Sequence, residues 1–153
     1  MLNVRNAQKS DATVIHQLIG ELADFEKLRA EVNGSVEDLE QHLFGAEPYA
    51  RVLIAESGEQ VAGFALYFFN YSTFLCKPGI YLEDLFVRPQ FRGAGVGRAL
   101  LDAVEQRARE RGCGRLEWSV LDWNTRAKSF YEEFGAGPRG GWTVYRKSLT
   151  GPS

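Results

Sequence analysis

A cluster of glycines is the feature of this sequence that points most directly to chemistry. An apolar stretch ends at Val87, and the sequence RGAGVG at residues 92–97 then leads straight into a helical pattern. Glycines lack the Cβ atoms that would keep a ligand away from backbone N–H groups, and a helix N-terminus carries partial positive charge. The segment therefore predicts a loop that binds a phosphate or a pyrophosphate.

The spacing of these glycines narrows the kind of ligand. Gly93, Gly95 and Gly97 follow a G-x-G-x-G pattern, which differs from the G-x-G-x-x-G fingerprint of dinucleotide-binding proteins. No Gly-Lys-Ser or Gly-Lys-Thr follows, so the pattern of an ATP-binding P-loop is absent as well. Nicotinamide and ATP are therefore disfavoured. A simpler interpretation stays open, in which the glycines only form a tight turn between a strand and a helix.

The spacing of apolar residues predicts the elements that must hold this loop in place. Helical periodicity indicates helices over residues 12–25, 36–43, 96–111 and 124–134, and Ser35 with Asp38 resembles a capping box before the second helix. Alternating or β-rich stretches predict strands over residues 2–6, 51–55, 60–69, 80–87, 115–121 and 142–148. The resulting fold class is mixed α/β (α+β), with antiparallel strands at the start of the chain.

Length and composition favour one globular domain. The 153 residues are a usual size for a single domain, and 44% hydrophobic with 25% charged residues is close to the globular average. We expect one domain over residues 1–150 and a short tail over 151–153. The net charge of −2 lacks the basic excess that binding to a phosphate backbone needs, so nucleic acid and anionic membranes are disfavoured as partners.

The cysteines and the N-terminus indicate the compartment. Cys76 and Cys113 are the two cysteines, and with two histidines and no CxxC motif they favour neither a disulfide framework nor a zinc site. The apolar stretches are far shorter than the roughly 20 residues of a membrane span, and residues 1–6 do not resemble a signal peptide. These features favour a reducing, cytoplasmic location.

Residues 92–97 resemble the acetyl-CoA loop of the GNAT acetyltransferases, which reads Arg/Gln-x-x-Gly-x-Gly/Ala after a strand ending in Val-x-Pro. The resemblance covers nearly the whole chain and is closest to the spermidine/spermine (diamine) and thialysine acetyltransferase branch, through ELADFE at 21–26, YLEDL at 81–85 and VLDWN at 120–124. It implies the GNAT fold, in which about four helices flank a mixed, mostly antiparallel central sheet. It also implies acetyl-CoA as co-substrate, no metal and a homodimer.

The resemblance further implies which residues bind each substrate. In that family the loop amides bind the CoA pyrophosphate, and the pantetheine arm lies along the preceding strand like an added strand. The residues expected to contact acetyl-CoA are Leu85, Phe86, Val87, Arg92, Gly93, Ala94, Gly95, Val96, Gly97, Arg98, Asn124, Thr125, Arg126, Ala127 and Tyr131. The residues expected to contact the amine are Phe25, Glu26, Glu83, Glu117, Trp118 and Ser119.

Acetyl transfer to an amine needs a group that accepts a proton from the nucleophile, because an alkyl amine with a pKa of about 10.4 is almost fully protonated at neutral pH. Glu83 is our candidate, since it lies on the strand beside the expected pantetheine path, two residues before Leu85. The alternative is a structural carboxylate at a strand edge or in an ion pair. In a regular pleat Asp84 points the other way, an assignment that a β-bulge would weaken.

The departing thiolate needs a proton donor. Tyr131 follows Asn124 by seven residues, so two helical turns place both side chains on nearly one face. A phenol with a pKa of about 10 is protonated at neutral pH and can give its proton to a thiolate. We therefore expect Tyr131 to act as general acid and Asn124 to cap its helix; a core tyrosine packed beside Phe130 and Phe134 is the alternative.

The sequence thus predicts an acetyl-CoA-dependent N-acetyltransferase that acts on a primary amine of a small molecule, such as a polyamine, thialysine or a similar amino compound. The amine would attack directly in a ternary complex, without a covalent enzyme intermediate. A protein or peptide N-acetyltransferase and a non-catalytic acyl-CoA-binding regulatory module stay open as alternatives. The joint presence of Glu83, Asn124 and Tyr131 argues against the regulatory module.

Overall fold

A computed structural model of the chain describes residues 1–150, so the expected tail at 151–153 lies outside the described residues. The chain divides into two compact units, of which the first is Met1–Ser119 and the second begins at Val120. The first unit holds the sheet and the glycine loop, and the second holds a single α-helix within its described residues, 120–150.

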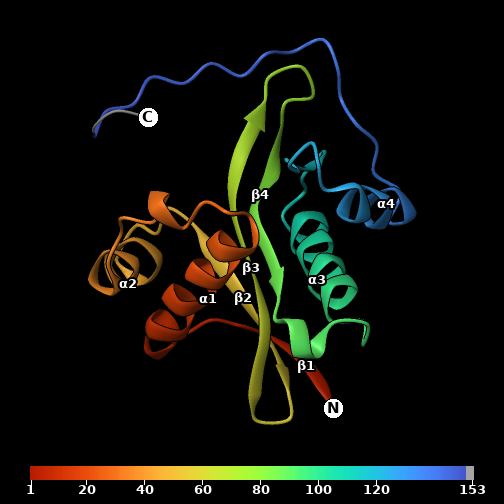
Figure 1. The fold of residues 1–153 in the computed structure, drawn as a ribbon. Helices are drawn as coiled ribbons and strands as arrows, with labels where there is room; N and C mark the ends of the chain where they lie inside the picture. Colours follow the sequence, from red (N-terminus) through yellow and green to blue (C-terminus); the bar gives the residue numbers. More distant parts are fainter. Residues whose placement is uncertain (151–153) are drawn as a thin grey trace. The chain divides into compact units, whose positions relative to one another are not determined.

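The first unit is built on a five-stranded sheet (Figure 1). Its strands, in their order across the sheet, are β1 (Leu2–Asn6), β2 (Arg51–Ser57), β3 (Gln60–Ser72), β4 (Lys77–Val87) and β5 (Leu116–Trp118). Neighbouring strands are antiparallel except for β4 and β5, which are parallel. The predicted mixed, mostly antiparallel sheet is therefore confirmed, and so are the strands expected from residue 2 to residue 87.

Helices cover both faces of this sheet (Figure 1). The α-helices of the first unit are α1 (Ala12–Phe25), α2 (Val36–Phe44) and α3 (Val96–Glu110), and three short 3-10 turns are η1 (Lys9–Asp11), η2 (Arg29–Glu31) and η3 (Pro89–Phe91). The apolar positions of α1 and α2, spaced three to four residues apart, pack with Ile54, Phe64 and Phe86 into one core. On α3 the same spacing buries Leu100 and Val104 against the opposite face.

Local signals set the ends of the helices as the sequence predicts. Before α2, the Asp38 amide donates to Ser35 Oγ and the Ser35 amide donates to Asp38 Oδ2, both at 3.1 Å, which completes the capping box. Gly112 follows α3 with a φ of 72°, a left-handed conformation that glycine adopts without a steric cost. Both helices begin and end within two residues of their predicted bounds.

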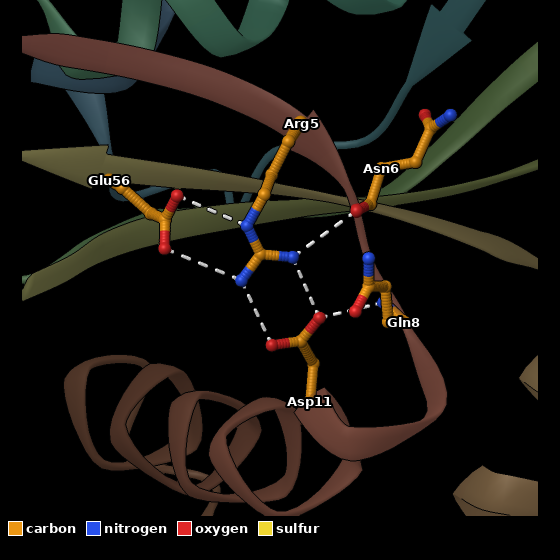
Figure 2. Close-up of polar contacts among 5 residues, drawn as sticks. All are labelled: Arg5, Asn6, Gln8, Asp11 and Glu56. Atoms are coloured by element: carbon orange, nitrogen blue, oxygen red, sulfur yellow. Dashed lines mark hydrogen bonds and ion pairs between the residues drawn. The ribbon is translucent and has the colours of Figure 1, made fainter. Parts of the chain in front are cut away.

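A network of charges joins β1, β2 and the start of α1 (Figure 2). The Arg5 guanidinium donates to both carboxylate oxygens of Asp11, at 2.8 and 3.0 Å, and its Nε lies 3.1 Å from Glu56 Oε1. Asp11 Oδ2 also accepts from the Gln8 amide at 2.7 Å. The Arg5 hydrogen bonds hold the pKa of Asp11 below its usual range. The network therefore fixes the N-terminus of α1 against the edge of the sheet.

The second unit contains α4 (Thr125–Glu133). Asn124 Oδ1 accepts from the Ala127 amide at 3.1 Å, and Gly135 follows the helix with a φ of 101°, so the predicted cap and the predicted end are both confirmed. The strand expected over 142–148 is wrong, because these residues form no strand, and Trp142 and Tyr145 are 87% and 92% exposed. Alternating side chains favour a strand, but a strand exists only where a neighbour completes its hydrogen-bond ladder.

The strand at the far edge of the sheet, β5, differs from the prediction in length. The strand expected over 115–121 is shorter, since β5 spans Leu116–Trp118. Among the helices of residues 1–150, none has the length and apolar character that crossing a bilayer would require.

Candidate active site

The glycine loop lies between the end of β4 and the start of α3. Gly93 and Gly95 have φ values of 82° and 84°, and Gly95 is the N-cap of α3. A Cβ atom built on either glycine would meet no other atom within 4 Å, so open space faces the loop within the described residues. The first-turn amides of an α-helix have no carbonyl partner inside the helix. A helix N-terminus of this kind suits an anion, and we call residues 93–97 the anion cradle; that this loop binds a phosphate stays a prediction.

The strand that leads into this loop has an open edge. β5 pairs with β4 from Ile80 opposite Leu116 to Leu82 opposite Trp118, and the pairing stops there. From Glu83 to Val87 β4 keeps β3 as its partner on one side, and no described strand pairs with its other side. An extended ligand can therefore form strand-like hydrogen bonds with this part of β4.

A β-bulge lies at the point where the edge opens. Asp84 is opposite Leu66 and Leu82 is opposite Tyr67, so Glu83 is an extra residue on β4. Counting back from Phe86, which packs against α1, the alternation of the strand places Asp84 on the α1 face. Glu83 is exposed and Asp84 is half-buried. The bulge thus interrupts, at Glu83, the regular pleat that would place neighbouring side chains on opposite faces.

The carboxyl group of Asp84 is influenced by two others, those of Glu83 and Glu26. Burial raises the pKa of Asp84 to about 7, and the negative charges of Glu83 and Glu26 add to this rise. Burial also raises the pKa of Glu26, which follows the last residue of α1. Such a cluster favours a cation, and an ammonium group is the cation that acetyl transfer to an amine requires. Sequence reasoning assigned no role to Asp84, because a bulge cannot be read from the residues of one strand.

The Arg92 side chain turns back toward the protein. Its Nε donates to the Val87 carbonyl at 3.0 Å, and its guanidinium carbon lies 5.0 Å from the ring centroid of Phe25 and 5.7 Å from that of Phe86. These are cation–π distances. Arg98, another residue expected to contact acetyl-CoA, has its Nε 3.0 Å from Asp102 Oδ1 on the next turn of α3.

The predicted amine contacts on and after β5 lie beside β4. Glu117 is opposite Tyr81, and the Ser119 hydroxyl is hydrogen-bonded to the Tyr81 hydroxyl. Glu117 Oε1 lies 3.2 Å from Arg115 Nε, so part of its charge is already balanced. Trp118 is half-buried. Within the first unit, the residues expected to contact the amine therefore lie on β4, at the end of α1, and on or directly after β5.

The remaining predicted residues belong to the second unit. The Asn124 carbonyl oxygen caps α4 through the Ala127 amide, which leaves its NH₂ group outside the cap. Thr125 and Arg126 are exposed in the first turn of the helix. Tyr131 is half-buried, and its ring centroid lies 5.5 Å from that of Phe130. Asn124 and Tyr131 share one side of α4, as their seven-residue separation predicts.

No metal cluster is found in the part of the chain that the structure describes. Among residues 1–150, no three His, Cys, Asp or Glu side chains lie close enough together to hold a metal ion. Cys76 and Cys113 are free thiols. A glycine loop at a helix N-terminus, an open strand edge and a carboxylate cluster are thus the chemical features of the site.

Comparison with known proteins decides the family. Residues 17–136 match the acetyltransferase (GNAT) family. The chain belongs to the GNAT acetyltransferase family. It is therefore an enzyme that transfers an acetyl group to an amine, and acetyl-CoA is the acetyl donor that GNAT acetyltransferases use.

Relatives and a solved structure agree with this assignment. A thialysine N-epsilon-acetyltransferase of Bos taurus is 40% identical over 87% of this chain and 82% of its own. An L-ornithine N5-acetyltransferase of Arabidopsis thaliana is 33% identical over 97% of this chain and 84% of its own. A crystal structure described as a probable acetyltransferase superimposes with a TM-score of 0.83 at 21% identity, covering 98% of this chain and 99% of that one. The last comparison shows that the GNAT fold is shared.

The raised pKa of Asp84 predicts how the stability of this acetyltransferase depends on pH. The carboxyl group has a pKa of about 7 in the folded protein, against an ordinary value of 3.8. The folded state therefore holds this proton more tightly, so the stability it contributes is complete below pH 4 and is lost as the pH rises to about 7. Asp84→Asn cannot ionise, and its free energy of unfolding should gain about 2–4 kcal/mol relative to wild type between pH 4 and pH 8.

Urea denaturation at five pH values measures this difference. Asp102→Asn removes an exposed carboxylate on α3 and serves as the control, with an expected pH dependence close to that of the wild type. Parallel stability curves for wild type and Asp84→Asn would show that Asp84 ionises normally in the folded enzyme.

Proposed function

We propose that this enzyme transfers the acetyl group of acetyl-CoA to a primary amine of a small molecule, by direct attack in a ternary complex. One observation carries the proposal: a single open strand edge on β4 leads from the carboxylate cluster at the bulge to the anion cradle. A polyamine, thialysine or a similar amino compound is the proposed acceptor. The thialysine and ornithine acetyltransferases among the relatives support this substrate class.

Acetyl-CoA would bind along β4 and the loop. The amides of residues 93–97 would hold the pyrophosphate, and the backbone of residues 85–87 would hold the pantetheine arm as an added strand. In the second unit, Asn124 and the first turn of α4 would contribute further contacts through an amide group and helix N–H groups. We further propose that both units, residues 1–150, work as one N-acetyltransferase domain.

The amine would bind at the carboxylates. Glu83 is exposed and would accept the ammonium proton, directly or through a water molecule, so that the neutral amine can attack the thioester carbonyl. Asp84 and Glu26 would strengthen the attraction for the cation. Phe25, with 42% of its surface exposed, offers an apolar contact for the alkyl chain of the substrate.

Tyr131 would complete the reaction. When the tetrahedral intermediate collapses, its phenol O–H would donate a proton to the departing thiolate of CoA, which makes the free thiol a stable product. The enzyme would then need neither a metal nor a cysteine nucleophile. A cytoplasmic location and a homodimer belong to the same proposal, on the strength of the family resemblance and of the reduced cysteines.

Binding of acetyl-CoA by the loop is tested at Gly95. Asp and Asn both tolerate a left-handed conformation, so Gly95→Asp and Gly95→Asn carry similar strain and differ chiefly in charge. If the pyrophosphate lies against this residue, the Asp variant should bind acetyl-CoA about tenfold or more weakly than the Asn variant, because like charges repel. Isothermal titration calorimetry measures both affinities; equal values would refute the phosphate assignment.

The acceptor is tested by a panel of amines. Release of the CoA thiol should be fast with polyamines, thialysine, lysine or ornithine and slow with peptides that present a free N-terminus or a lysine side chain. A carboxylate cluster attracts a compact cation without requiring a peptide backbone nearby. A colorimetric thiol assay at fixed acetyl-CoA gives kcat/KM for each compound. Faster turnover of peptides would establish the protein N-acetyltransferase instead, and no turnover would support the regulatory module.

The two proton-transfer roles predict different kinetic defects. Tyr131→Phe removes only a hydroxyl group, so acetyl-CoA affinity should hold within a few-fold while kcat falls by roughly 10²–10⁴. Glu83→Gln should lower kcat/KM for the amine, and higher pH should partly restore it because more free amine is present. Steady-state kinetics between pH 7 and 10 compares the variants. Wild-type kcat in Tyr131→Phe, or an unaltered pH profile in Glu83→Gln, would remove the corresponding role.

A further inference from the structure

Arg88 connects the end of β4 to α1 and β3. Its Nε and Nη2 donate to the two carboxylate oxygens of Glu21 on α1, at 3.1 and 3.0 Å, and its Nη1 donates to the Val61 carbonyl on β3 at 3.1 Å. Its own amide donates to the Ala62 carbonyl at 2.8 Å. The Arg88 side chain is 20% exposed and that of Glu21 is 37% exposed. A bidentate, partly buried Arg–Glu ion pair fixes the relative position of its two residues better than an exposed Lys–Glu ion pair would.

A second contact lies one helical turn further along α1. Phe25 follows Glu21 by four residues, so both side chains lie on the same face of the helix. Phe25 contacts Arg92, which follows Arg88 by four residues on the other side of η3. One face of α1 therefore holds the chain on both sides of the turn that precedes the glycine loop.

We call these two contacts, Glu21 with Arg88 and Phe25 with Arg92, the clamp. The clamp matters because the glycine loop is itself flexible. Gly93 and Gly95 both adopt left-handed conformations, and glycine loses more conformational freedom on ordering than any other residue. A ligand that must order a mobile loop binds more weakly, because the ordering cost is subtracted from the binding free energy. Fixing Arg88 and Arg92 removes part of that cost before the ligand arrives.

We propose that Glu21 and Arg88 are positioning residues, which hold the glycine loop in the conformation that binds acetyl-CoA. This inference rests on the proposed function of the loop and adds to it a residue pair that is assigned neither to the acetyl-CoA contacts nor to the carboxylate cluster. The pair acts through the backbone of residues 88–92, so its loss affects binding of the acetyl donor and spares the amine and the chemical step.

The test compares Glu21→Gln with Glu105→Gln. Glu105 on α3 pairs with Arg109 at 2.6 Å, so both variants lose one carboxylate of a Glu–Arg pair, and residue 105 is more than two turns beyond the start of α3. Glu21→Gln should bind acetyl-CoA about three- to tenfold more weakly, the range expected for a partly buried ion pair. Its KM for the amine and its kcat at saturating acetyl-CoA should stay within about twofold. Glu105→Gln should match the wild type in all three quantities.

Hydrogen exchange provides a readout that needs no activity. Amides of residues 93–97 should exchange faster in Glu21→Gln than in the wild type without ligand, while the amides of α3 beyond its first turn should be unchanged. The conservative variant Arg88→Lys keeps the charge but cannot bind both oxygens of Glu21, so it should show an intermediate defect. The double variant Glu21→Arg with Arg88→Glu should recover part of the affinity.

The outcomes separate the two proposals. Unchanged acetyl-CoA affinity and unchanged loop exchange in a folded Glu21→Gln protein would overturn the clamp. Equal losses in acetyl-CoA binding, amine KM and kcat would also overturn it, since they would indicate a general structural role. If the wild type itself fails to bind acetyl-CoA, the proposed function fails, and hydrogen exchange still decides the clamp. If Glu21→Gln does not fold, Arg88→Lys takes its place in the same comparison.

Discussion

The pairing of β3 with β4 is the interaction on which the rest of the site depends. β3 holds β4 along nearly its whole length, from Lys77 to Val87, whereas β5 holds it only as far as Leu82. The single shift in the register between β3 and β4 adds Glu83 as an extra residue directly before Asp84. The same strand then delivers the chain to the glycine loop. A change in this register would move both the carboxylates and the start of the loop, because side chains alternate with a period of two.

The carboxylate cluster is electrostatically unfavourable in the folded protein. The charges of Glu83 and Glu26 disfavour the ionised form of Asp84, and burial disfavours the ionised forms of Asp84 and Glu26. The packing of α1 and α2 on the sheet supplies the stability that tolerates this arrangement, since it buries a continuous apolar core that includes Phe86, two residues after Asp84. A group whose pKa lies near neutrality and whose neighbours are acidic is typical of a functional site rather than of a stabilising ion pair. The contrast with Asp11 is instructive, because its partner Arg5 lowers the pKa and stabilises the charge.

α1 contributes to both ends of the proposed reaction. Its packed face forms the core, and its C-terminal end leads directly to Glu26 of the cluster. Glu21 and Phe25 contact the two arginines that precede the loop. The Arg5 network fixes the other end of the same helix. A rigid helix anchored at its start can therefore set the position of residues at its end, which is the kind of support that a binding site on a flexible loop requires.

The sequence by itself determined the features that depend on local chemistry. The glycine loop, the caps at Ser35 and Asn124, the helix ends at Gly112 and Gly135 and the strands up to residue 87 all follow from residue types within a few positions of one another. The family assignment follows from the same local motifs.

Only the tertiary structure decided the features that depend on a partner strand or helix. The bulge at Glu83 requires the register with β3, and the short β5 and the absent strand at 142–148 depend on which neighbours offer hydrogen bonds. The pairing of Arg88 with Glu21 joins residues 67 positions apart. Local sequence specifies backbone conformation through sterics and capping, whereas pairing and burial are set by segments far away in the chain, so the environment of each carboxylate could be known only from the folded protein.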